Sequence, residues 1–399
     1  MFVSRLVLLA AALGLAPAVA SAQTPSDADS RLLLESRLRG EWVDQQGFAA
    51  DAEALTLRTR LGWRSPTAHG LQWLIEGEGV AVLDDRYSAP VDPAPGRPSV
   101  ADGETMELNR AQVRWTGWPD TEVTVGRQRL IAGNARFVGN SGWRQNEQTF
   151  DALRLVTTAL KPVTVTWAFA DRVQRPLGHE HAQGVWRGDI HLLQAGTETP
   201  LGQLTGYGLA IDLDNAPGQS STTVGARLAG SRPLHDALSL TWAGEYATQS
   251  DAGANPADYQ LTLTAAALGV QTPDWSGTVG YERYDGDGRT GFQTPLGSGH
   301  GFLGWSDVIA ATPAFGVRDL FVRGQVGAPA LGRTLRLTAE AHVFHDADGR
   351  LALGRELDVS ATLPIDAHWA VEVKAAHFDG DQPAFGDADK GWLILEYRY

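Results

Sequence analysis

The stretch Leu34-Glu35-Ser36-Arg37-Leu38-Arg39-Gly40-Glu41-Trp42 alternates between two kinds of side chain. One face of an extended chain would carry Leu34, Leu38 and Trp42, and the other would carry Arg37, Arg39 and Glu41. Successive side chains of a β-strand point to opposite faces of the sheet. The stretch therefore predicts a strand with one apolar face and one charged face.

The next segment repeats this pattern, with Leu55, Leu57, Leu61 and Trp63 opposed to Arg58, Arg60 and Arg64. Later segments place apolar residues at every second position around Val165, Leu240, Leu337 and Leu393. A soluble β-sandwich also alternates, but its apolar faces need a second sheet to cover them. A membrane barrel alternates lipid-facing and lumen-facing residues on every strand. The pattern predicts an all-β fold, a transmembrane antiparallel up-and-down β-barrel.

About eighteen strands are expected, an even number typical of bacterial single-chain barrels. They lie near residues 32–43, 53–64, 70–83, 106–116, 121–129, 150–157, 162–171, 189–195, 201–213, 221–230, 237–248, 258–269, 274–285, 317–327, 334–345, 354–364, 368–378 and 390–399. The connections alternate between tight turns rich in Pro, Gly or Asp, such as 117–120, and longer segments, such as 86–104. One missing strand would destroy this parity, so the alternation supports the topology.

The first 22 residues resemble a secretory signal peptide. Arg5 precedes an apolar run, and Ala20-Ser21-Ala22 has the small-x-small pattern of a cleavage site. We expect residues 1–22 to be the signal peptide and residues 23–399 the barrel, located in the bacterial outer membrane among lipid and lipopolysaccharide. The chain has no cysteine, and its formal net charge is -14. That charge argues against nucleic acid as a partner, because a phosphate backbone binds basic surfaces.

Arginine is the candidate functional residue of the lumen, since it stays charged and can bind carboxylates with two hydrogen bonds. Strand parity predicts that these basic residues line the pore: Arg37, Arg39, Arg58, Arg60, Arg64, Arg114, Arg154, Arg323, Arg336 and Lys374. The same parity places Glu76, Glu78, Glu340, Glu356, Asp358 and Glu372 inside. The first two strands contribute five of the arginines beside one inward acid, Glu41, which predicts a positive stripe and an anion-conducting channel.

No catalytic site, cofactor or metal is expected. The sequence has no Gly-x-Ser-x-Gly motif and no cysteine nucleophile. The glycines at 286, 288 and 291 fit a dinucleotide motif only formally, because no helix pattern follows them. His179 and His181 lack a third ligand, and the acid-rich stretches at outer strand ends are typical of turns. The protein is therefore expected not to be an enzyme.

Two blocks carry a resemblance to a known family. They are VGRQRLIAGNARFVGNSGWRQNEQTFDALRL (125–155) and GFQTPLGSGHGFLGWSDVIAATPAFGVRDLFV (291–322), together with LRTRLGWRSP (57–66). The chain resembles the alginate-export family of outer-membrane proteins. The resemblance implies a monomeric barrel that exports an anionic polysaccharide, with Arg127, Arg129, Arg144 and Asp151 along the pore.

Strand parity conflicts with part of this implication. Val123 and Val125 set the lipid face of their strand, which would turn Arg127 and Arg129 outward as well. Either the strand ends near Gly126 or a bulge resets its alternation. The segments 130–149 and 286–316 are long, and we expect one of them to fold into the lumen. An inward Trp392 could stack on sugar rings.

Two functions remain open from the sequence. The leading one is passive export of an alginate-like anionic polysaccharide. The alternative is a porin that takes up small organic anions or sugar acids, because an arginine-rich lumen serves either direction of flux.

Overall fold

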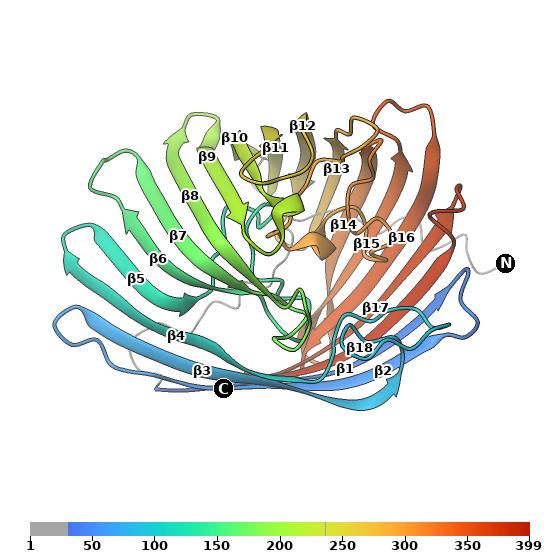
Figure 1. The fold of residues 1–399 in the computed structure, drawn as a ribbon, viewed down its shortest axis with the longest axis horizontal. Coiled ribbons are helices and arrows are strands. Elements are labelled where there is room, and N and C mark those ends of the chain that lie inside the picture. Colours follow the sequence, from blue (N-terminus) through green and yellow to red (C-terminus); the bar gives the residue numbers. More distant parts are fainter. Residues whose placement is uncertain (1–30, 236) are drawn as a thin grey trace.

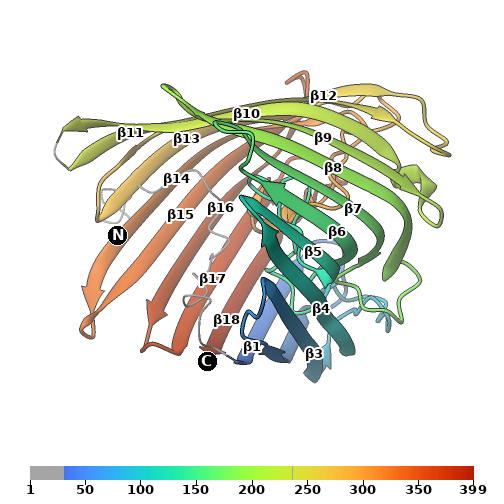
Figure 2. The same ribbon diagram turned by 90° about the vertical axis from the view of Figure 1, so that its left-hand side faces the viewer.

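The computed structural model describes residues 31–235 and 237–399, which form one sheet of 18 antiparallel strands (Figures 1 and 2). The strands are β1 (Leu32–Gln45), β2 (Ala52–Arg64), β3 (Leu71–Arg86), β4 (Thr105–Trp118), β5 (Thr121–Gln128), β6 (Thr149–Thr157), β7 (Thr164–Gln174), β8 (Val185–Thr199), β9 (Gly202–Leu213), β10 (Ser221–His235), β11 (Leu238–Asp251), β12 (Gln260–Gln271), β13 (Trp275–Tyr284), β14 (Val317–Ala330), β15 (Arg333–His345), β16 (Ala352–Pro364), β17 (Trp369–Gly380) and β18 (Ala388–Arg398). Two short 3-10 turns, η1 (Pro217–Gln219) and η2 (Gly299–Gly301), lie in loops. The expected signal peptide, residues 1–22, lies outside the described residues.

The sheet closes on itself. Each strand pairs with its neighbours in sequence, and β1 pairs with both β2 and β18. The seam between the first and last strands runs from Glu35 opposite Arg398 to Gln45 opposite Ala388. A closed sheet leaves no unpaired strand edge, which a lipid environment requires. The predicted barrel and its 18 strands are confirmed.

The two faces of the wall follow the predicted alternation. Leu61, Val322 and Leu393 are more than half exposed on the outer face, whereas Arg58 and Arg60 are buried on the inner face. Within residues 31–235 and 237–399, no helix is long and apolar enough to cross a membrane.

A charge on the outer face should be costly. Val322 lies near the middle of β14 with its side chain outward. We expect Val322→Arg to lower the free energy of unfolding by about 2–4 kcal/mol, the cost of an arginine facing lipid at mid-depth. Denaturant unfolding in lipid vesicles measures this difference, with Val322→Leu as the control that keeps the surface apolar. Equal stability of the two variants would contradict the outward placement of this residue.

Short turns and long loops lie at opposite ends of the barrel. Two residues separate β4 from β5 and β8 from β9, whereas 20 residues separate β5 from β6 and 32 separate β13 from β14. We call residues 129–148 the first inner loop and residues 285–316 the second inner loop, because both pack against the inner wall (Figure 1). The sequence predicted one such loop; the structure has two.

Candidate functional site: a lumen narrowed by two loops

The two inner loops pack against each other inside the barrel. Val138 and Leu296 form an isolated parallel bridge, and the amide of Gly139 donates to the carbonyl of Leu296 at 2.9 Å. Gln148 Nε2 donates to the carbonyls of Gly139 and Leu296, both at 2.8 Å. The buried side chains of the loops include Leu130, Phe137, Val138, Phe292 and Leu296. These contacts join segments about 150 residues apart into one body.

Charged side chains of β1 and β2 hold the first inner loop. Arg37 and Arg39 donate to the carbonyl of Trp143 at 3.1 and 2.7 Å. Gln145 Nε2 donates to Thr56 Oγ1 at 2.8 Å, and the Gln145 side chain is fully buried. The loop is thus bound to the wall through its backbone as well as its side chains.

Arg136 holds the same loop to the opposite wall. Its Nη1 and Nη2 donate to the two carboxylate oxygens of Glu282 on β13 at 2.7 and 2.8 Å, and its Nε donates to Glu245 on β11 at 3.1 Å. The guanidinium also lies 4.2 Å from the centre of the Phe302 ring. This buried arginine is paired with two carboxylates. The first inner loop therefore spans the lumen from β1 to β13.

The second inner loop is bound to β16. The amide and hydroxyl of Ser306 both donate to Glu356, at 2.6 Å each. The amide of Trp305 donates to Asp358 at 3.3 Å. Glu356 and Asp358, which the sequence placed inside the barrel, are therefore acceptors for a loop backbone.

An aromatic cage surrounds the ammonium group of Lys374. The Nζ atom lies 3.8 Å from the Trp305 ring centre, 4.2 Å from that of Trp143 and 5.6 Å from that of Trp392. Lys374 also donates to Nε2 of His300 at 2.6 Å. Burial and the nearby Lys374 charge lower the pKa of His300 to about 3, so its ring is neutral. The cage joins both inner loops to β17 and β18.

Trp392 is therefore unavailable to a sugar. It is 3% exposed and packs edge-on against Trp143 at 5.5 Å between ring centres. The expectation that it could stack on sugar rings is wrong, because a tryptophan from the first inner loop already covers it.

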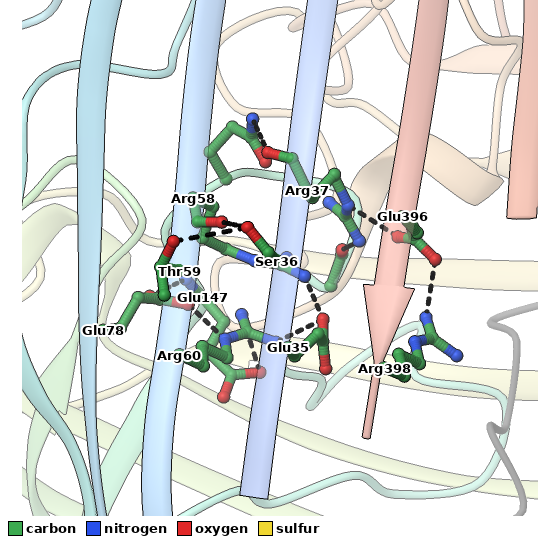
Figure 3. A network of polar contacts seen from close by, with 12 residues as sticks. Glu35, Ser36, Arg37, Arg58, Thr59, Arg60, Glu78, Glu147, Glu396 and Arg398 are labelled. Atoms are coloured by element: carbon green, nitrogen blue, oxygen red, sulfur yellow. Dashed lines mark hydrogen bonds and ion pairs between the residues drawn. The ribbon is translucent and has the colours of Figure 1, made fainter. Parts of the chain in front are cut away.

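The predicted positive stripe is a buried set of ion pairs (Figure 3). Arg58 has no exposed side-chain surface, and its Nη2 donates to Glu35. Arg60 pairs with Glu78 and lies 3.5 Å from Glu147, while Arg37 pairs with Glu396 at 2.7 Å. We call Arg37, Arg39, Arg58 and Arg60 the buried arginine cluster. Arg37 and Arg39 donate to the backbone of the first inner loop, and Arg60 lies beside Glu147 of that loop, so these three arginines hold the loop against the wall.

The prediction of one inward acid was wrong for two reasons. Glu35 has the same parity as Arg37 and also faces inward, which spacing alone shows. Asp102 and Glu147 come from loops and pair with Arg39 and Arg60, respectively. No strand periodicity could have placed these two carboxylates beside β1 and β2.

Accessible arginines lie on a different part of the wall, on β4, β6 and the start of the first inner loop. The side chains of Arg110, Arg114, Arg129 and Arg154 are 15, 33, 28 and 35% exposed. Their carboxylate partners Glu76, Glu122 and Glu147 are 4, 27 and 0% exposed. We call these four residues the arginine wall. A solute in the lumen meets more guanidinium than carboxylate there.

Arg114 and Arg154 share one carboxylate. Arg114 Nε donates to Glu122 at 2.6 Å, and Arg154 Nη1 lies 3.3 Å from the other oxygen of Glu122. Thr124 of β5 lies between the two arginines in the pairing of β4, β5 and β6, and it is buried. The two arginines therefore lie on the inner face with one positive charge uncompensated by this glutamate.

Arg127 and Asp151 do not line the pore. They occupy opposed positions on β5 and β6 and form a two-bond ion pair at 2.7 and 2.9 Å. Gln128 and Phe150 beside them are buried inward, so alternation turns the pair outward. β5 ends at Gln128, and Arg129 then enters the lumen to bind Glu147 at 2.6 Å. Strand parity turned both Arg127 and Arg129 outward, whereas the resemblance placed both along the pore. Because β5 ends at Gln128, Arg129 alone reaches the lumen.

The remaining predicted arginines differ in their positions and exposure. Arg144 reaches Asp307 of the second inner loop at 3.1 Å, and Arg323 pairs with Glu340 at 2.7 Å. Arg64 is buried at the end of β2, and Arg336 is exposed near the β14–β15 turn. Arg110 and Arg136 were missed. Arg110 has the same parity as Arg114 and the pairing between them is regular, so strand spacing could have identified it. Arg136 lies on irregular backbone, where period two does not apply.

The inner wall of β10–β15 contains a hollow beside the loops. Three rows of directly opposed residues cross it. The rows are Arg227, Glu245, Ala265, Glu282 and Asp319; Ala229, Ala243, Ala267, Gly280, Phe321 and His342; and Thr241, Gly269, Thr278, Arg323 and Glu340. The middle row has small residues from Ala229 to Gly280, so a hollow that is partly open to solvent remains beside the row of Glu245, Glu282 and Asp319. We call this space the alanine hollow. Phe302 of the second inner loop also lines it.

These features define the class of protein. A closed 18-stranded barrel with an apolar outer face and a polar lumen is a bacterial outer-membrane β-barrel. The two inner loops leave a narrowed, charged interior.

No protein-family model and no curated protein sequence matches this chain. Solved structures with a similar fold include OccAB3 of Acinetobacter baumannii, with a TM-score of 0.71 and 13% identity over 92% of this chain and 99% of that one. OccK9 (OpdG) of Pseudomonas aeruginosa has a TM-score of 0.71 and 18% identity over 93% and 98% of the two chains. OpdK of Pseudomonas aeruginosa, solved with vanillate, has a TM-score of 0.70 and 14% identity over 92% and 98%.

The resemblance to the alginate-export family is wrong. The solved structures that share this fold include Occ and Opd barrels, which match nearly the full length of both chains. The two sequence blocks behind the resemblance cover much of the two inner loops. In this fold they are segments that fill the lumen.

Proposed function

We propose that the protein is a passive channel for small organic anions, a porin and not an enzyme. The observation that carries the proposal is the arginine wall, where four arginine side chains are accessible and only one of their carboxylate partners is comparably exposed. Fixed charge along a pore sets its ion preference. Anions should therefore enter more readily than cations.

The position of the two inner loops supports the proposal that the solute is small. They cross the lumen from β1 to β13 and are bound by buried ion pairs, which leaves spaces such as the alanine hollow. OpdK, one of the barrels that share this fold, was solved with vanillate, which is a small organic anion. This similarity of fold agrees with the charge of the wall.

Removing two accessible arginines should weaken the preference of the channel for anions. We expect wild-type protein in a planar bilayer to be anion-selective, measured as the reversal potential in a potassium chloride gradient. Arg114→Gln/Arg154→Gln should shift the reversal potential toward cation selectivity, because Glu122 then remains without its two guanidinium partners.

Arg355→Gln is the matched control, since Arg355 is 66% exposed on the outer face of β16. It should leave the reversal potential unchanged. A cation-selective wild type, or a double variant with wild-type selectivity, would contradict the proposed function.

A further inference from the structure

The alanine hollow contains an unsatisfied hydrogen-bond acceptor. Asp319 is 1% exposed, and its Oδ2 accepts from Nδ1 of His342 at 2.8 Å. Its Oδ1 has no hydrogen-bond partner within residues 31–235 and 237–399. A buried carboxylate oxygen without a donor costs free energy. A solute that donates a hydrogen bond at this position would remove that cost.

The charge around Asp319 favours a neutral donor over a cation. His342 already faces the carboxylate, and it also lies 3.5 Å from Glu340. Arg136 binds the two carboxylates that lie nearest along the same row, Glu245 and Glu282. Asp319 therefore needs a hydrogen-bond donor and no second positive charge, which is the chemistry of a hydroxyl group.

A carboxylate partner lies next to this acceptor. Arg323 uses Nε and Nη2 to bind Glu340 at 2.7 and 2.8 Å, and its side chain is still 21% exposed. It lies two positions along β14 from Phe321, which itself lies two positions from Asp319. The two residues are four positions apart, about 13 Å along the strand. The Arg323 guanidinium lies 5.6 Å from the centre of the Phe321 ring, so it leans along the strand toward Asp319 and brings the two polar groups within the span of one small molecule.

The floor of the hollow suits a carbon skeleton. Ala243 and Ala267 line the hollow with methyl groups, and the Phe321 ring covers Gly280, where an added Cβ would meet it at 2.1 Å. Phe302 closes the side formed by the second inner loop. Polar rows above and below this floor leave an apolar strip between them.

We propose that the alanine hollow is a binding subsite for hydroxylated carboxylates such as sugar acids. The carboxylate faces Arg323, and a hydroxyl group donates to Oδ1 of Asp319. This inference rests on the proposed anion channel and adds the class of anion that the channel retains longest.

Single-channel current interruptions test the subsite. Gluconate, hexanoate and 6-aminohexanoate have six carbons each and differ in their hydroxyl and amino groups. Gluconate should interrupt the wild-type current for the longest times. Asp319→Asn should shorten the gluconate interruptions about tenfold, because a neutral amide oxygen accepts a weaker hydrogen bond than a charged carboxylate oxygen. Hexanoate interruptions should not change, and the outward Asp379→Asn should behave as wild type.

A second variant keeps every polar group of the site. Ala267→Leu fills the floor of the hollow and should also shorten gluconate interruptions, whereas Ala341→Leu, on the outer face of β15, should not. Equal interruption times for gluconate and hexanoate, or longer ones for 6-aminohexanoate, would overturn the subsite while anion selectivity still stands. Loss of anion selectivity in the wild type would instead remove the proposed function.

Discussion

Replacing Arg136 with methionine is expected to release the first inner loop and raise the single-channel conductance. The substitution keeps an unbranched side chain but removes the guanidinium that binds Glu245 and Glu282 and lies over Phe302. Breaking a buried ion pair by removing one partner costs about 3–5 kcal/mol, because the remaining charges stay buried without compensation. The loop would lose its attachment to β11 and β13.

Arg289→Met is the matched control, because Arg289 is exposed in the second inner loop. Conductance in a planar bilayer measures the width of the lumen, and heat-modified gel mobility verifies that the barrel itself remains closed. A conductance equal to that of Arg289→Met would show that Arg136 does not hold the loop.

Replacing Glu147 with glutamine should have the second largest effect. Glu147 has no exposed side-chain surface, and it accepts hydrogen bonds from Arg129 at 2.6 Å, Asn109 at 2.6 Å and Asn140 at 2.9 Å. Glutamine removes the negative charge and puts an amide donor among these donors. The cost should be about 1.5–3 kcal/mol for each lost bond to a charged group. Larger conductance and faster proteolysis of residues 129–148 measure the release, with the exposed Glu180→Gln as control.

The pH dependence of this contact follows from the charge of Glu147. Burial opposes ionisation, but Arg129 and Arg60 outweigh it and hold the pKa of Glu147 well below its ordinary value of 4.5. A carboxyl group with a lowered pKa stabilises the folded form above its unfolded pKa, and that stabilisation is lost only as the pH falls toward the lowered value. The difference in conductance between wild type and Glu147→Gln should therefore persist from pH 7 down to 4.5. A difference that vanished above pH 4.5 would contradict the lowered pKa.

Much of the wall could be predicted from the sequence because a strand imposes a fixed period. Leu61 and Arg60 were correctly assigned to opposite faces from spacing alone. Glu35 could have been assigned in the same way, since it lies two positions from Arg37. The arginine wall was partly anticipated through Arg114 and Arg154 for the same reason.

The interior could not be predicted in this way, because loops have no period. Glu147 and Asp102 reach the buried arginine cluster from irregular segments, and they turn an expected positive stripe into paired charges. Arg129 shows a related limit. β5 ends at Gln128, so Arg129 leaves the outward parity that it shares with Val125 and Arg127 and turns into the lumen to bind Glu147.

The seam between β1 and β18 has a consequence for the order of assembly. Arg37 of β1 binds Glu396 of β18 and the first inner loop together, and Trp143 of that loop packs against Trp392 of β18. This docking surface does not exist until the first and last strands have met. The first inner loop therefore reaches its complete set of wall contacts only once the barrel has closed, and it then spans the junction between the first and last strands.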